Sequence, residues 1–224
     1  MAAPTQSPMP APGPRSGEPV RLVRPAPERA TSPLTGDPAW LALPSFVVGS
    51  VAFGMVLIGY LPAAASIGPM LPVIIAASIG LFVATIWAAV IGQSPQAGIY
   101  GIFTGFFMSE ALLNLGTAHG WFGITLASMA QTSKLFTIAW MVIITMLVLA
   151  MFRLPVIYPV VFGLVDVSLL LYLLSIIQSS ANLAKAAGWV VMAFAAITVY
   201  LFLSSASHAT GGREFPLGRP ILHS

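Results

Sequence analysis

Six long apolar runs dominate this sequence and decide in which solvent it can fold. The runs cover residues 41–61, 70–92, 98–117, 134–152, 156–178 and 186–204. A helix needs about 20 mostly apolar residues to cross the roughly 30 Å hydrocarbon core of a bilayer. Because each run is continuous rather than alternating, it suits a helix and not a strand of a membrane barrel. The sequence therefore predicts an all-α membrane protein, a bundle of six transmembrane helices.

The composition excludes several other classes of protein. Only 7% of the residues are charged and 58% are hydrophobic, so a soluble fold would expose large apolar patches. The net charge is +3, but the nine Lys and Arg residues are scattered over the tails and the ends of the runs, so we expect no nucleic-acid partner. The chain has no cysteine, which excludes disulfides, thiol catalysis and cysteine metal sites.

Composition also divides the chain into three parts. Residues 1–36 contain nine prolines and four arginines, which predicts a disordered cytoplasmic tail. Residues 37–206 form the predicted six-helix transmembrane domain, and residues 207–224 a cytoplasmic C-terminal tail. Most links between the runs are short, but residues 118–133 read AHGWFGITLASMAQTS and predict one longer loop between the third and fourth spans.

The positive charges predict the orientation. An even number of spans puts both tails on one side, together with the links after the second and fourth spans. Only Lys134 and Lys185 fall on the opposite side, while the other seven Lys and Arg residues share the side of the tails. Since positive charge is retained in the cytoplasm, we expect both termini to be cytoplasmic and the protein to span the plasma membrane several times.

Two acidic residues lie deep within the runs. Glu110 falls near the middle of the third span and Asp166 near the middle of the fifth, with no Lys or Arg placed to pair with either. An ionised acid in that position costs about 2.5–3.5 kcal/mol, so both side chains should face the bundle interior or a wet cavity. Without a cationic partner the proton-bound form is favoured, which predicts that both residues handle protons.

Helical spacing gives Glu110 a defined face. Phe106, Glu110 and Asn114 are four residues apart and therefore lie one above another. A second interpretation remains open, in which the acids are permanently neutral and only hydrogen-bond between helices. Asn114, Thr145 and Ser109 are the partners that the sequence offers for such bonds.

The stretch GDPAWLALPSF, residues 36–46, resembles the signature of the GPR1/FUN34/YaaH acetate transporter family. FTGFF at 103–107, Gly188-Trp189 and FPLGRP at 215–220 are similar to further family motifs in the same order. The chain is thereby identified as a divergent, succinate-acetate permease-like member of that family. Six positions of the signature match, namely Pro38, Ala39, Leu41, Leu43, Ser45 and Phe46, and three depart from it, namely Asp37, Trp40 and Ala42.

The resemblance implies a function and a set of site residues. It implies a six-helix protomer in a hexameric ring, where each subunit carries acetate or succinate without a cofactor. Asp37 and Pro38 stand at the entrance of its pathway. The constriction falls on Phe46, on Phe106 and on Leu164 or Val165, depending on one residue of register. Proton coupling and a channel-like mechanism both remain open.

A carboxylate substrate also needs hydrogen-bond donors along its route. The runs contain no internal Lys or Arg, so Asn114 and Thr104 are the predicted substrate-binding residues. The expected partners are thus a small monocarboxylate, a proton and the lipid bilayer.

Three other functions are weighed against this one. Acidic lining would suit a channel for ammonium or another small solute. A sealed bundle would suit a non-transporting membrane scaffold. An enzyme is not expected, because the sequence contains no HExxH, no GxSxG and no P-loop, and we expect no metal site.

Overall fold

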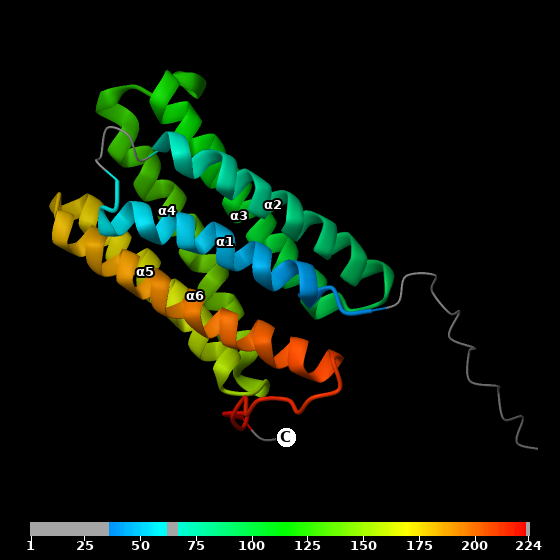
Figure 1. The fold of residues 1–224 in the computed structure, drawn as a ribbon. Coiled ribbons are helices and arrows are strands. Elements are labelled where there is room, and N and C mark those ends of the chain that lie inside the picture. Colours follow the sequence, from blue (N-terminus) through cyan, green and yellow to red (C-terminus); the bar gives the residue numbers. More distant parts are fainter. Residues whose placement is uncertain (1–35, 62–66, 223–224) are drawn as a thin grey trace, which may run out of the picture. The chain divides into compact units, whose positions relative to one another are not determined.

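The structure is a computed structural model that describes residues 36–61 and 67–222. Nearly all of the predicted N-terminal tail, 1–36, lies outside the described residues, which belong to one compact unit, Ser32–Ser224. Within them, the chain forms six long helices and no strand (Figure 1). These are α1 (Ala39–Ile58), α2 (Ile67–Val90), α3 (Ser94–His119), α4 (Leu126–Ala150), α5 (Ile157–Gln178) and α6 (Ala181–Ala209), with short 3-10 turns η2 (Trp121–Gly123) and η3 (Met151–Arg153).

The all-helical prediction is confirmed, with one helix for each apolar run. Five of the helices are long and apolar enough to cross a membrane. The exception is α3, which carries Gln96, Glu110 and Asn114 among its apolar residues. The protein is thus a multi-pass membrane protein, and its sixth span stays a prediction.

The predicted long loop at 118–133 is wrong. α3 continues to His119 and ends at Gly120, whose φ of 68° is left-handed. α4 then begins at Leu126, because Thr125 and Ser128 form a capping box in which each side chain bonds the other residue's backbone N–H. Only residues 120–125 separate the two helices. At the other end of the chain, α6 runs to Ala209, beyond the predicted boundary at 206.

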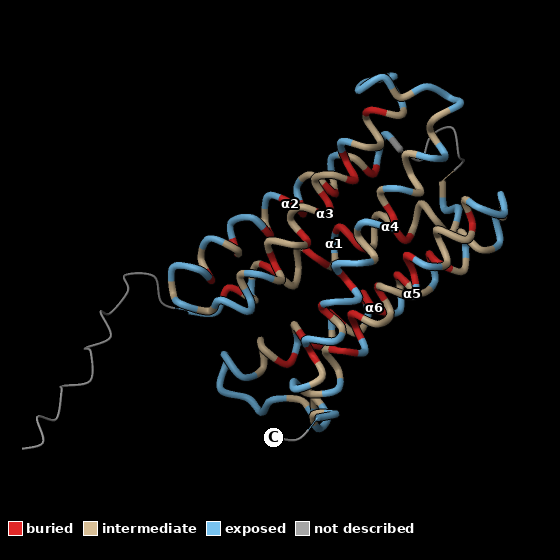
Figure 2. The backbone as a smooth tube through the Cα atoms, turned by 180° about the vertical axis from the view of Figure 1, so that it is seen from behind, coloured by how far each residue is buried: buried red, intermediate tan, exposed pale blue. Residues whose placement is uncertain are grey.

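The helices pack in the order α3, α2, α1, α6, α5, α4, each against the next. α1 therefore lies between α2 and α6, as Figure 1 shows. Buried residues follow the facing sides of the helices, and exposed residues cover the outside (Figure 2). This is the pattern of a bundle whose outer surface meets lipid or another subunit.

Glycines let α1 approach both neighbours closely. A Cβ built on Gly188 of α6 would lie 2.8 Å from the backbone N of Ile58 and 2.8 Å from Cβ of Leu57. A Cβ on Gly49 would lie 2.9 Å from Cβ of Ala77 on α2. The small residues of these helices thus serve packing within the subunit.

The two ends of the helical unit meet at the start of α1. The Asp37 carboxylate accepts a hydrogen bond from the backbone N–H of Ala39 at 2.9 Å. Its second oxygen accepts one from the Ser205 hydroxyl, near the end of α6, at 3.1 Å. We call this side of the unit the Asp37 end. Since α1, α3 and α5 are alternate helices, all three begin there.

The segment after α6 crosses back to the start of α5. We call residues 213–222 the C-terminal strap. Its carbonyl groups at Leu217 and Arg219 accept backbone bonds from Ile157 at 3.3 Å and Val156 at 3.2 Å. The Phe215 N–H donates to the Ser204 hydroxyl oxygen at 2.9 Å. The strap therefore ties α5 to α6 at the Asp37 end.

The close approach of α6 to α1 predicts a large effect of one methyl group. We expect Gly188→Ala to destabilise the protein by about 1–3 kcal/mol, because backbone and side-chain atoms of α1 occupy the space. Gly163→Ala on α5 is the matched control, since nothing lies within 4 Å of its Cβ position. Thermal melting of the detergent-purified protein measures both. Equal melting temperatures for the two variants would contradict the close contact.

Candidate functional site

A cavity of about 580 Å³ opens at the Asp37 end. It extends between α1, α3, α5 and α6, and the C-terminal strap contributes Glu214 and Leu217 to its wall. The polar and titratable lining residues are Asp37, Gln96, Tyr100, Tyr158, Thr198, Ser204, Ser205, His208 and Glu214. The remaining wall is apolar.

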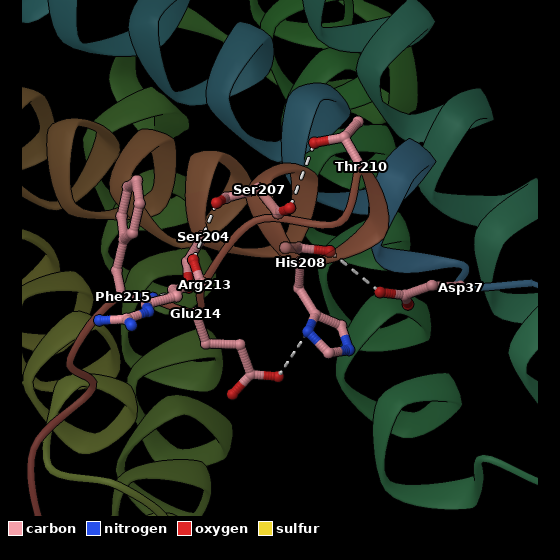
Figure 3. A network of polar contacts seen from close by, with 9 residues as sticks. Asp37, Ser204, Ser207, His208, Thr210, Arg213, Glu214 and Phe215 are labelled. Carbon is pink, nitrogen blue, oxygen red and sulfur yellow. Dashed lines mark hydrogen bonds and ion pairs between the residues drawn. The ribbon is translucent and has the colours of Figure 1, made fainter.

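A polar network forms the rim of this cavity (Figure 3). The Asp37 carboxylate is bonded by the Ser205 hydroxyl, as described above. His208 Nδ1 lies 3.6 Å from Glu214 Oε1, and both side chains are more than 60% exposed. Because solvent screens so exposed a pair, it contributes little to stability. Asp37 and Glu214 are therefore the acidic groups that line the rim, and Arg213 belongs to the same network (Figure 3).

Three aromatic residues lie at the inner end of the cavity, away from the Asp37 end. On α1, α3 and α5 the deepest lining residues are Phe46, Phe103 and Phe162. The Phe46 and Phe103 rings meet edge to face with centroids 4.7 Å apart. The Phe103 and Phe162 rings are stacked, with centroids 5.9 Å apart and planes 17° apart. We call these three residues the aromatic floor; all three side chains are buried.

The predicted constriction residues lie at different depths. Phe46 lines the cavity. Phe106 lies on the side of the aromatic floor away from the cavity. Its ring centroid is 6.5 Å from that of Phe103, and the ring packs edge to face on Trp140 of α4. Val165 is buried and Leu164 half-buried, and neither lines the cavity. The structure thus brings Phe46 to the cavity and leaves the other three inside the packed bundle.

Glu110 lies beyond the floor and is 5% exposed. The Asn114 side-chain amide donates to Glu110 Oε1 at 2.8 Å and to the Glu110 carbonyl at 2.8 Å. No salt bridge to Glu110 occurs within the described ranges 36–61 and 67–222. The face predicted from helical spacing is therefore turned inward, and Asn114 is the hydrogen-bond partner of Glu110.

Asp166 lies at the contact between α4 and α5. The Thr145 hydroxyl donates to Asp166 Oδ2 at 2.9 Å. Oδ1 is buried and has no hydrogen-bond partner among the described residues. The Asp166 side chain is half-buried and does not line the cavity.

The remaining predicted site residues are Thr104, Pro38 and Asp37, and each has a different environment. The Thr104 hydroxyl donates to the Tyr100 carbonyl at 2.9 Å, one turn back on α3. Pro38 is buried as the N-cap residue of α1. Asp37 lines the rim. Sequence reasoning missed Phe162, Tyr100 and Tyr158; the signal for Tyr100 was its spacing of three residues from Phe103.

Comparisons with known proteins agree with this architecture. The sequence model of the GPR1/FUN34/yaaH family matches residues 21–212. A solved structure described as "Structure of the bacterial acetate channel SatP" superimposes with a TM-score of 0.72 at 20% sequence identity, covering 82% of this chain and 99% of that one. At that identity the likeness shows the fold. No curated protein matches this chain in sequence.

The buried Glu110–Asn114 pair predicts strong coupling between the two residues. Asn114→Leu removes the donor and leaves a buried carboxyl group unpaired, so we expect a loss of about 1–3 kcal/mol. Glu110→Leu combined with Asn114→Leu removes both partners and should restore much of that loss. A double-mutant cycle on thermal melting in detergent checks this. Additive effects would mean that the hydrogen bond does not couple the residues.

Proposed function

Because this chain belongs to the GPR1/FUN34/YaaH family, we propose that it carries small carboxylates across the plasma membrane, the monocarboxylate acetate first and the dicarboxylate succinate as a further substrate. The observation that carries the proposal is the cavity of about 580 Å³ that leads from the Asp37 end to Phe46 within a membrane-spanning bundle. A scaffold needs no such cavity. The bacterial acetate channel with the same fold supports acetate as the first substrate to test.

The proposed pathway runs inward from the cavity along α3. A solute passes the aromatic floor and then meets Phe106, Glu110 and Asn114, which share the inward face of that helix. Phe46, Phe106 and Leu164 or Val165 form the proposed constriction. Apolar rings gate by dewetting, so a neutral acid crosses them more easily than an ionised one.

Glu110 is the proposed proton carrier of this pathway. Its burial makes the ionised form costly, and its side-chain donor among residues 36–61 and 67–222 is the neutral Asn114 amide. Binding a proton removes that cost and leaves a group that can hydrogen-bond a passing carboxyl. Asp166 is the second proposed proton-handling residue, and Asn114 and Thr104 are proposed to bond the substrate.

The orientation and assembly belong to the same proposal. The hydrogen bond between Asp37 and Ser205 supports termini on one side, and the excess of Lys and Arg supports a cytoplasmic location for them. The exposed apolar faces of α2 and α4 give room for lipid and for neighbouring subunits, here proposed to form a hexameric ring.

The acidic rim supports one alternative. Asp37 and Glu214 line the cavity mouth, and acidic groups attract cations. An ammonium channel is therefore the second candidate function.

Vesicle uptake separates these functions. Purified protein in liposomes should accumulate labelled acetate, and external acidification should increase the accumulation if a proton accompanies the substrate. Labelled methylammonium tests the cation channel and empty liposomes give the background. Protein-dependent uptake of methylammonium without acetate uptake would overturn the carboxylate proposal.

Proton handling by Glu110 predicts a changed pH profile. Glu110→Gln keeps the size and the hydrogen bond to Asn114 but cannot exchange a proton. We expect the pH dependence of acetate uptake to flatten, because one coupled titration is lost. Asp166→Asn is the parallel variant on α5. A wild-type pH profile in Glu110→Gln would remove Glu110 from the coupling.

A further inference from the structure

Two tyrosines stand directly above the aromatic floor. Tyr100 precedes Phe103 by three residues on α3, and Tyr158 precedes Phe162 by four residues on α5. Both spacings put side chains on one face of a helix, one turn apart. α3 and α5 both begin at the Asp37 end, so each tyrosine lies one turn nearer the mouth than its phenylalanine. Because the two phenylalanines are stacked, the two tyrosines face the same volume of the cavity, which both of them line.

The tyrosine hydroxyls are free to bind a ligand. Within the part of the chain that the structure describes, neither hydroxyl bonds to the protein, whereas the Tyr200 hydroxyl donates to the Pro216 carbonyl at 3.1 Å. In the described part of the chain, the buried side-chain N and O atoms that lack a hydrogen-bond partner are Trp87 Nε1 and Asp166 Oδ1. Neither tyrosine hydroxyl is among these buried atoms. Both hydroxyls therefore reach open space, and the open space beside them is the cavity.

Other donors near the floor are already used. The Thr198 hydroxyl, the deepest polar group of α6 in the lining, donates to the Phe194 carbonyl at 2.9 Å. The Ser205 hydroxyl donates to Asp37 at the rim. Ser204, whose oxygen accepts from the Phe215 N–H, and Gln96, four residues before Tyr100 on α3, lie nearer the mouth of the cavity. Among the described lining residues, the two phenolic groups are thus the unpaired donors nearest the floor.

We propose that this cavity contains a carboxyl-binding subsite, in which the Tyr100 and Tyr158 hydroxyls donate to the carboxyl group of a short monocarboxylate whose alkyl group rests on the Phe103–Phe162 stack. The phenols supply hydrogen bonds without charge, so the subsite holds the acid without trapping it. The stacked rings offer apolar contact to a methyl group and no acceptor or donor. This inference rests on the proposed function and adds the specificity-determining residues to it.

Removing each hydroxyl tests the subsite. We expect Tyr100→Phe and Tyr158→Phe each to weaken acetate binding by about two- to tenfold, the effect of one lost hydrogen bond. The double variant should lose more than either single one. Tyr60→Phe is the matched control, because Tyr60 is exposed beyond the far end of α1. Equilibrium binding of labelled acetate to the full-length, detergent-purified protein gives the affinity, and melting temperatures confirm that each variant is folded.

The floor is tested with a second ligand. Phe162→Leu keeps an apolar side chain but removes the stacked ring, so it should weaken binding of acetate more than binding of formate, which has no methyl group. The same variants in liposomes should raise the half-saturation concentration for acetate uptake more than they lower the maximal rate.

The outcomes separate the subsite from the proposed function. Tyrosine-dependent acetate binding without any uptake would refute transport and support the subsite. Acetate uptake with unchanged binding in both Tyr→Phe variants would overturn the subsite and leave transport standing. Absence of acetate binding, or tyrosine-dependent binding of methylammonium instead, would also overturn it.

Discussion

Hydrocarbon offers no hydrogen bonds to a polar group, and this constraint organises the interior of the bundle. Most hydroxyls of the helices donate to a carbonyl of their own chain one turn back, as Ser45 does to Leu41 at 2.7 Å and Thr137 to Ser133 at 2.8 Å. Such bonds satisfy the side chain locally and leave it nothing to offer a solute. A helix bundle with many Ser and Thr residues can therefore still have few donors for a substrate. This contrast gives the two unpaired phenols their significance.

The phenylalanines avoid this constraint, because their side chains have no polar atom that needs a hydrogen bond. Phe46 contacts Phe103 edge to face and also packs against Phe194, with centroids 5.8 Å apart. Phenylalanines from α1, α3, α5 and α6 thus meet where the cavity ends, and they fill the middle of the bundle without a polar atom to satisfy. Glu110 lies on the other side of this layer with its own amide partner. The layer of phenylalanines therefore separates the cavity at the Asp37 end from the Glu110–Asn114 pair.

Sequence reasoning predicted the architecture because hydrophobic length is a local property. The six apolar runs became six helices, and the spacing of Phe106, Glu110 and Asn114 correctly gave an inward face. The prediction of a long loop at 118–133 was wrong because α4 begins at a capping box formed by Thr125 and Ser128. Short polar residues of this kind interrupt an apolar run, so a search for apolar runs places the start of the helix too late. The prediction that Phe46 belongs to the site came from the resemblance to the family signature. Tyr158 and Phe162 were missed because their role depends on which helix faces α3 across the cavity, and no spacing within one helix contains that information.

The C-terminal strap has a consequence for how the cavity wall is completed. Glu214 and Leu217 belong to that wall, but they follow α6 in the chain and lie outside all six helices. The wall is therefore complete only when α6 has packed beside α1 and the strap has bonded to the start of α5. A variant without residues 213–222 would keep all six helices and still lack this part of the wall.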